Sequence, residues 1–248
     1  MTLHPFQVSA PNSRISFKVG DSENGRPWWY YLNIDDEPLY LVSNICDTCP
    51  LILGRYNNGN FILTPEELSQ KLRNGLTAIS PEIIALLSSI LPSGDYYAGL
   101  IQVSPIIARP YTYADKKKKS NEESQYWWQN EPNFMLKAGC SLNELIEPLT
   151  LGTSLSLATI NQFKERLSAG EAPTALALSV LDVRCLSGKA LEVTLVHFLL
   201  DGHHKMKAAE ELKMPLNILS LLWKNWPFTL PAFLEETLEL RYGETSNK

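Results

Sequence analysis

The sequence has no apolar run long enough to cross a lipid bilayer. Its strongly apolar stretches, such as residues 83–91, fall well short of the roughly 20 residues that a membrane-spanning helix needs. Residues 1–5 also lack the charged and apolar segments of a secretory leader. We therefore expect a cytoplasmic protein that has no membrane partner.

Cysteine is scarce, and of the four cysteines only Cys46 and Cys49 are close together in sequence. A disulfide-stapled secreted domain has a denser spacing, so we expect reduced thiols. A Cys-x-x-Cys pair can also bind zinc or cycle as a dithiol, but structural zinc needs about four ligands and no second pair exists. Buried, unreactive cysteines are the favoured interpretation, and a zinc site at Cys46 and Cys49 is the alternative.

An excess of basic residues is also missing. The net charge is -5 and the sequence pI is about 5.5, which disfavours general electrostatic binding to nucleic acid. A run of four lysines at residues 116–119 is followed by Glu122 and Glu123, which is typical of a solvated loop. The hydrophobic content of 44% and charged content of 20% indicate an ordinary globular chain with a sizeable core.

The first half of the chain is predicted to be rich in β-structure, with two helices. Residues 15–56 contain alternating, aromatic and β-branched segments that favour an antiparallel meander. Thr64, Pro65 and Glu67 have the spacing of a helix cap, which predicts a helix over residues 65–73. A second helix is expected from Pro81 to about residue 91, and a strand over residues 96–107.

The second half is predicted to contain a helix, strands and a strand-turn-helix-strand unit. The expected helices cover residues 157–167 and 205–213, and the expected strands cover residues 175–183, 192–200 and 215–222. The predicted fold class is thus α+β. We expect a mixed, β-rich N-terminal region, an exposed linker, an α+β module and a C-terminal extension, over residues 1–110, 111–140, 141–226 and 227–248.

The turn inside that unit is the strongest candidate site. Gly202 can adopt backbone angles that are closed to other residues, and the following helix directs unsatisfied amides and a positive dipole end outwards. His203, His204 and Lys205 add donors beside these amides, which suits a phosphate or a carboxylate. Asp201 could accept a ligand hydroxyl, orient a histidine, help to hold a metal ion or cap the helix. The alternative is an ordinary turn with surface histidines.

Residues 198–219, which read FLLDGHHKMKAAEELKMPLNIL, resemble the signature of the ParB and sulfiredoxin-like superfamily. In that group a strand ends in a glycine-containing, histidine-containing turn, and a helix with paired alanines follows. The similarity extends over residues 142–223, although only the quoted stretch is specific. It implies that the turn binds the phosphates of a nucleotide such as ATP, ADP or CTP with Mg²⁺, and that Asp201, Gly202, His203, His204 and Lys205 inherit this role.

Two departures limit what the resemblance implies about chemistry. Lys205 stands where arginine is usual, which replaces a bidentate phosphate contact with a point charge. The turn also has no cysteine, so sulfinic-acid repair is not expected. Only 25 residues follow Trp223, too few for the DNA-binding and dimerisation regions of a partitioning protein.

Two functions therefore remain open from the sequence. The leading hypothesis is binding of a nucleotide or another phosphate ligand, with phosphotransfer or hydrolysis as an added step in which Asp201 and His204 are the candidate catalytic residues. Such a kinase or hydrolase needs a general base, for which Glu144 and Glu147 are the available carboxylates. The alternative is a non-catalytic adaptor or immunity-type protein that binds a protein partner and retains the module as a degenerate scaffold.

Overall fold

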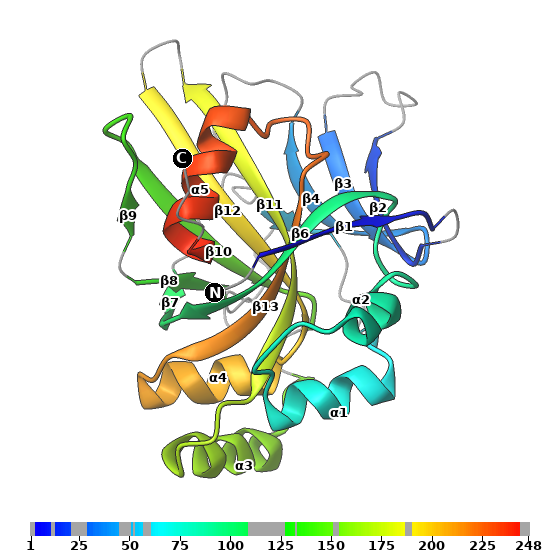
Figure 1. Cartoon of the computed structure of the whole chain (residues 1–248), viewed down its shortest axis with the longest axis vertical. Helices are drawn as coiled ribbons and strands as arrows, with labels where there is room; N and C mark the ends of the chain where they lie inside the picture. Colours follow the sequence, from blue (N-terminus) through cyan, green and yellow to red (C-terminus); the bar gives the residue numbers. More distant parts are fainter. Residues whose placement is uncertain are drawn as a thin grey trace.

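A large, twisted mixed sheet forms the centre of the molecule, and a small antiparallel sheet packs beside it (Figure 1). The structure is a computed structural model that describes residues 3–10, 13–20, 29–44, 51, 53–56, 61–108, 127–131, 133–150, 154–186 and 190–243. In these residues the large sheet has nine strands and the small sheet has four. The α+β class predicted from the sequence is confirmed.

The strands of the large sheet come from both halves of the chain. Its spatial order is β1 (His4–Val8), β6 (Gly94–Val103), β13 (Leu216–Trp223), β11 (Thr174–Leu186), β12 (Ala190–Asp201), β10 (Ser141–Pro148), β8 (Trp127–Asn130) and β7 (Pro105–Ala108), with β9 (Phe134–Met135) beside β10. The small sheet has the order β2 (Ile15–Val19), β3 (Trp29–Ile34), β4 (Glu37–Asn44) and β5 (Leu53–Arg55). The helices are α1 (Glu66–Asn74), α2 (Pro81–Leu87), α3 (Leu157–Ser168), α4 (His203–Leu212) and α5 (Pro231–Tyr242).

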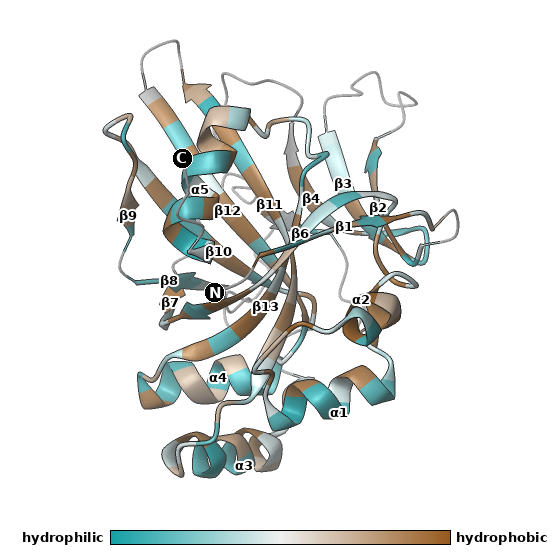
Figure 2. Ribbon diagram, in the orientation of Figure 1, coloured by the Kyte–Doolittle hydropathy of each residue, from teal (hydrophilic) through white to brown (hydrophobic). Residues whose placement is uncertain are grey.

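Each face of the large sheet packs on its own apolar core. Alternate residues of β11 point to opposite faces, as the period of a strand requires, so Leu176 and Leu178 belong to one core while Ala175 and Ala177 belong to the other. The first core contains the small sheet, α1 and α2, and the second contains α3, α4 and α5. Figure 2 shows the apolar residues that run along the central strands.

Strand directions bring three segments to the same edge of the large sheet. β12 is parallel to β10 and antiparallel to β11, with Pro148 opposite Leu199 and Leu176 opposite Asp201. The end of β10, the start of β11 and the end of β12 therefore lie together. This edge carries the turn at Gly202, and α1, α3 and α4 lie at the same end of the molecule (Figure 1).

Much of the predicted secondary structure is confirmed. The meander, the helices near residues 65–73 and 157–167, and the unit formed by β12, α4 and β13 are all present. The strand expected over residues 96–107 is instead divided at Ser104 into β6 and β7, and the Ser104 amide donates to the side-chain oxygen of Asn130 at 2.8 Å. β8 and β9 lie within the segment expected to be a linker, and residues 111–126 of that segment are outside the described residues.

The predicted helix ends need three corrections. The capping box at Thr64 is wrong, because α1 has no side-chain cap and its N-cap residue is Pro65. α2 ends at Leu87, and residues 88–90 continue as turns rather than as helix. α5 was not expected in the C-terminal extension, although Pro231 at its start and Gly243 with φ of 69° at its end are typical boundary residues. No helix in the described ranges is long and apolar enough to span a membrane.

Candidate functional site

The turn between β12 and α4 depends on Gly202 for two separate reasons. Gly202 has φ of 103°, a left-handed conformation that side-chain-bearing residues rarely adopt. A Cβ atom at this position would also lie 2.7 Å from the Cβ and 2.9 Å from the Cα of Ala175 on β11. The turn therefore packs directly against the neighbouring strand. α4 begins at His203 with no side-chain cap, which leaves its first-turn amides available to a ligand.

Lys205 contributes to the inside of the turn rather than to its surface. The residue is 3% exposed, and its Nζ donates to the Thr174 carbonyl at 2.8 Å and to Asp201 Oδ1 at 3.1 Å. Burial lowers the pKa of Lys205, and the neighbouring Asp201 carboxylate opposes part of this shift. In this arrangement the Lys205 ammonium fixes the turn to β11, and its predicted contact with a phosphate stays a prediction.

Asp201 is held from two sides. Its Oδ1 accepts from Lys205, and its Oδ2 accepts from the hydroxyl of Ser69 on α1 at 2.5 Å. The carboxylate is partly exposed, with 19% of its side-chain surface accessible. It can still present one face to a ligand while the Ser69 and Lys205 contacts fix its orientation.

Both histidines accept backbone hydrogen bonds through Nε2. The amide of Thr150 donates to His203 at 3.1 Å, and the amide of Ser156 donates to His204 at 3.0 Å. An imidazole that accepts at Nε2 is neutral and carries its proton on Nδ1. Burial lowers the pKa of His203 to about 3 and also lowers the pKa of the half-buried His204, which agrees with neutral rings. The histidines therefore position the backbone of Thr150 and Ser156.

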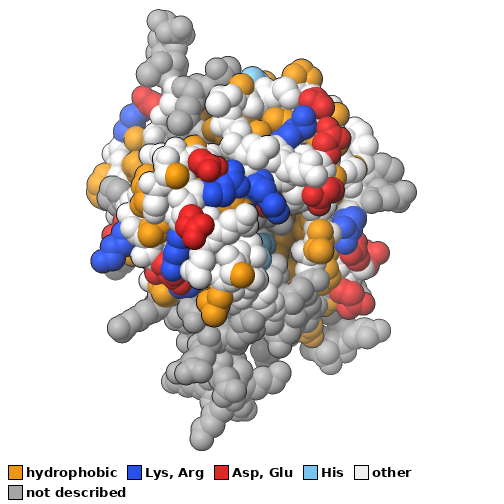
Figure 3. All heavy atoms as spheres, turned by 90° about the horizontal axis from the view of Figure 1, so that it is seen from below, with side chains coloured by type: hydrophobic (Ala, Val, Ile, Leu, Met, Phe, Trp, Pro, Cys, Tyr) orange, Lys and Arg blue, Asp and Glu red, His pale blue; other side chains and the backbone are white. Residues whose placement is uncertain are grey.

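A pocket of about 290 Å³ opens at this turn. Figure 3 looks onto this end of the molecule and shows a hollow near its centre, with a histidine and apolar side chains beside it. All five residues of the predicted turn line the pocket, so the structure brings the whole predicted site together. The described lining residues are Phe61, Ile62, Leu63, Thr64, Ser69, Arg73, Thr150, Thr159, Phe163, Leu200, Asp201, Gly202, His203, His204 and Lys205.

Two polar groups of this pocket were missed by sequence reasoning. Ser69 and Arg73 lie one turn apart on α1, so they face the same side of that helix, and both line the pocket. In the sequence they are ordinary polar residues of an amphipathic helix, more than 120 positions before the turn, and no local pattern distinguishes them. Arg73 is exposed and is the cation on the described walls whose charge a ligand can reach, since Lys205 is buried.

The two candidate general bases lie away from the pocket. Glu147 is fully buried between the sheets, and neither carboxyl oxygen has a hydrogen-bond partner among the described residues. Burial raises the pKa of Glu147 to about 8, against the opposing effect of the Arg55 guanidinium. Cys46 and Cys49, the candidate zinc ligands, are outside the described residues, and in the described ranges no group of three or more His, Cys, Asp or Glu side chains could hold a metal ion.

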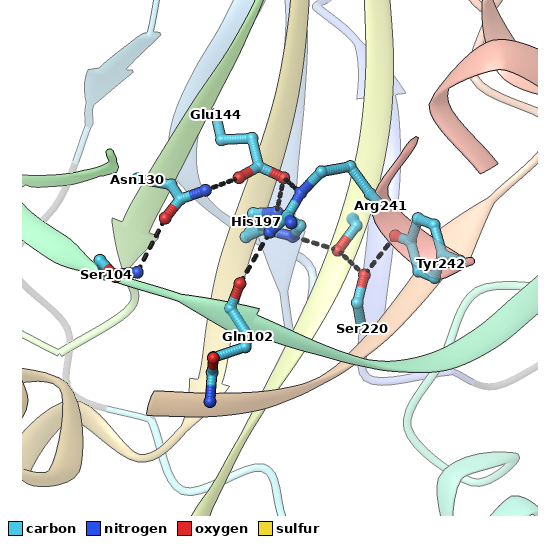
Figure 4. Close-up of polar contacts among 9 residues, drawn as sticks. Gln102, Ser104, Asn130, Glu144, His197, Ser220, Arg241 and Tyr242 are labelled. Carbon is cyan, nitrogen blue, oxygen red and sulfur yellow. Dashed lines mark hydrogen bonds and ion pairs between the residues drawn. The ribbon is translucent and has the colours of Figure 1, made fainter. Parts of the chain in front are cut away.

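Glu144 belongs to a separate buried network on the α5 face of the sheet (Figure 4). Its carboxylate accepts from Asn130 and from Arg241, and it lies 3.7 Å from Nε2 of His197. Burial would raise the pKa of Glu144, but His197 and Arg241 outweigh it and lower that pKa.

From His197 the network continues through Ser179 and Ser220 to the hydroxyl of Tyr242, with contacts of 2.7, 2.8 and 2.7 Å. Ser179, His197 and Ser220 are completely buried. The network thus connects α5 to the sheet and is closed to solvent, which is consistent with a structural role.

Comparisons with models of protein families, with curated proteins and with solved structures found no match. The chemistry of the pocket is therefore read from its own residues. The lining residues that the structure describes offer first-turn amides, hydroxyls from Ser69, Thr64 and Thr159, and one accessible cation at Arg73. Asp201 is the one carboxylate among the described lining residues. These amides, hydroxyls and the guanidinium can bind an anion, and the Asp201 carboxylate lies in the same pocket.

Proposed function

We propose that the protein binds a phosphate-bearing ligand in the pocket at the start of α4. The observation that carries the proposal is the uncapped N-terminus of α4, which opens into a pocket that Arg73 also lines. Helix amides and a guanidinium are the groups that bind phosphate oxygens elsewhere in proteins, and the helix dipole adds a favourable field. The place of this site agrees with the phosphate-binding role that the resemblance to the ParB and sulfiredoxin-like superfamily implies for the turn at residues 201–205, although the side chains of Lys205 and His204 are bonded within the protein.

A nucleotide is the ligand class that we propose first. The pocket of about 290 Å³ lies at the lower end of the range for small-molecule sites, so it would hold the phosphates and leave much of the nucleoside outside. A Mg²⁺ ion would be carried by the phosphates and by the Asp201 carboxylate, because this ion usually keeps several waters and takes few protein ligands. Asp201 fits that role, since two neighbours fix it while its surface remains partly exposed.

The geometry supports binding more directly than turnover. His204 accepts a hydrogen bond at Nε2, so its neutral ring has no free nitrogen to act as a base. Glu147 does not line the pocket. If phosphotransfer or hydrolysis occurs here, Asp201 is the residue that would accept the proton or position the attacking group.

Thermal unfolding with and without millimolar ATP, ADP or CTP and Mg²⁺ tests this function. A ligand at about 100 times its dissociation constant adds roughly 2.7 kcal/mol to the free energy of unfolding. We expect stabilisation of the native protein that is lost in Arg73→Gln. Lys213→Asn is the matched control, because it removes one positive charge at the opposite end of α4, where φ of 54° suits asparagine. Absence of stabilisation by any nucleotide, or equal loss in both variants, would contradict the proposal.

A non-catalytic protein-binding role is the second candidate. The burial of Lys205 favours it, because the residue is bonded to Thr174 and Asp201 and does not extend towards a ligand. In that case the turn is a folding element, and an adaptor or immunity-type partner would bind elsewhere, on the N-terminal half. Partner binding that survives Arg73→Gln, together with no nucleotide response, would favour this candidate.

A further inference from the structure

The segment that covers the pocket from the side of α1 has two features that the phosphate site alone does not explain. Thr64 is 7% exposed and lines the pocket, yet its hydroxyl oxygen is buried without a hydrogen-bond partner among the described residues. A buried hydroxyl without a partner is costly, by about 1–3 kcal/mol. A ligand in the adjoining pocket can supply the missing bond after a small rotation of the Thr64 side chain, because the hydroxyl oxygen is covered in the free protein.

Ile62 is the second feature. It is 88% exposed, although it also lines the pocket. Its carbonyl accepts from the Arg14 guanidinium at 2.8 Å, and Arg14 is paired with Asp35, so the backbone at this position is fixed by an anchored side chain. An isoleucine that is held at the mouth of a polar pocket offers an apolar contact to whatever projects from it.

The walls next to Ile62 are apolar as well. Phe61 and Leu63 flank it in the chain, and Phe163 from α3 contributes an aromatic ring to the pocket. The polar groups are therefore grouped at the turn and along α1, whereas the 61–63 segment provides an apolar side. A ligand that matches both parts must carry an anion at one end and an apolar group next to it.

We infer that the ligand of this site is a phosphate ester that carries an apolar or aromatic group, as a nucleotide does in its base, and that Thr64 hydrogen-bonds the phosphate while Ile62 contacts the apolar or aromatic group. This inference rests on the proposed phosphate site and narrows its ligand class. It separates such esters from inorganic phosphate, which leaves Ile62 uncovered, and from phosphates of simple sugars, which carry only hydroxylated groups to place against it, whereas a nucleotide carries an aromatic base.

Calorimetric titration with four probes tests the ligand class: inorganic phosphate, methyl phosphate, phenyl phosphate and glucose 6-phosphate. We expect phenyl phosphate to bind roughly tenfold more tightly than methyl phosphate, the gain for covering one small apolar surface, and glucose 6-phosphate to show no such gain. Equal binding of all four would overturn the inference and leave the phosphate site intact. Failure of all four to bind would overturn the phosphate site itself and the inference with it.

Two variants test the residues. Ile62→Ser should remove the advantage of phenyl phosphate and leave the affinity for inorganic phosphate unchanged. Thr64→Val should weaken inorganic phosphate roughly tenfold, as expected for a lost hydrogen bond to a charged group, and raise the midpoint of thermal unfolding of the free protein because a buried unpaired hydroxyl is removed. A Thr64→Val variant that binds phosphate as tightly as the native protein would exclude the assigned contact.

Discussion

The hydroxyl of Ser69 donates to the carboxylate of Asp201 at 2.5 Å, across 132 positions of the chain. This bond joins α1 to the end of β12 and thereby attaches the N-terminal half to the turn that forms the pocket floor. Lys205 holds the other oxygen of the same carboxylate. The orientation of Asp201 thus depends on residues from both halves of the protein.

We expect Asp201→Ala to destabilise the protein by roughly 3 kcal/mol, because it leaves the buried Lys205 ammonium without its carboxylate. Asp201→Asn keeps an oxygen for Lys205 and an amide for Ser69, so its cost should be nearer 1 kcal/mol. Urea unfolding of the two variants measures the difference. Equal stabilities would mean that the ion pair does not support the turn, and they would make Asp201→Ala an acceptable binding probe.

Gly202→Ala should lower the free energy of unfolding more than a glycine replacement that causes backbone strain alone. The left-handed conformation costs a side-chain-bearing residue about 1–3 kcal/mol, and the contact with Ala175 adds to that cost. Gly170→Ala is the control, since Gly170 has φ of 84° but an added Cβ would meet nothing within 4 Å. Urea unfolding of both variants should show the larger loss for Gly202→Ala. A similar loss in the two would argue against close packing of the turn on β11.

His203 should make the stability depend on pH. Its folded-state pKa of about 3 lies below its ordinary value of 6.5, so the unfolded chain takes up the proton first as the pH falls. The contribution of neutral His203 to the free energy of unfolding is complete above pH 6.5. It is lost as the pH falls towards 3, by about 1.4 kcal/mol per pH unit. His203→Gln keeps an acceptor for the Thr150 amide and does not titrate. Its stability relative to the native protein should therefore rise on acidification, and a constant difference would contradict a buried neutral His203.

Glu147 should make the stability depend on pH in the opposite direction to His203. Its folded-state pKa of about 8 lies above its ordinary value of 4.5, so the folded protein holds this proton more tightly than the unfolded chain does. The contribution of Glu147 to the free energy of unfolding is complete below pH 4.5. It is lost as the pH rises towards 8, by about 1.4 kcal/mol per pH unit. We expect Glu147→Gln to be increasingly more stable than the native protein between pH 5 and 8 in urea unfolding. Parallel stability curves would show that the carboxyl is solvated or paired.

Local sequence patterns predicted what depends on neighbouring residues. The Gly202 turn, α4 and the paired strands follow from glycine conformation, helix signals and apolar alternation, and all five turn residues do line one pocket. The positions of Ser69 and Arg73 do not follow, because they depend on how α1 packs across the sheet. The burial of Lys205 could not be predicted from local sequence patterns either. It results from the antiparallel pairing of β11 and β12, which places the Thr174 carbonyl beside the turn.

The central claim is that a phosphate-bearing ligand binds at the start of α4, and amide chemical shifts of the ¹⁵N-labelled protein test it most directly. On titration with phenyl phosphate, we predict that the largest shifts fall on the amides of residues 202–205, with smaller changes at Thr64 and Arg73. The same titration of Arg73→Gln should require a higher concentration to reach saturation. Shifts that cluster elsewhere, or amides of residues 202–205 that do not respond at saturating ligand, would contradict the account.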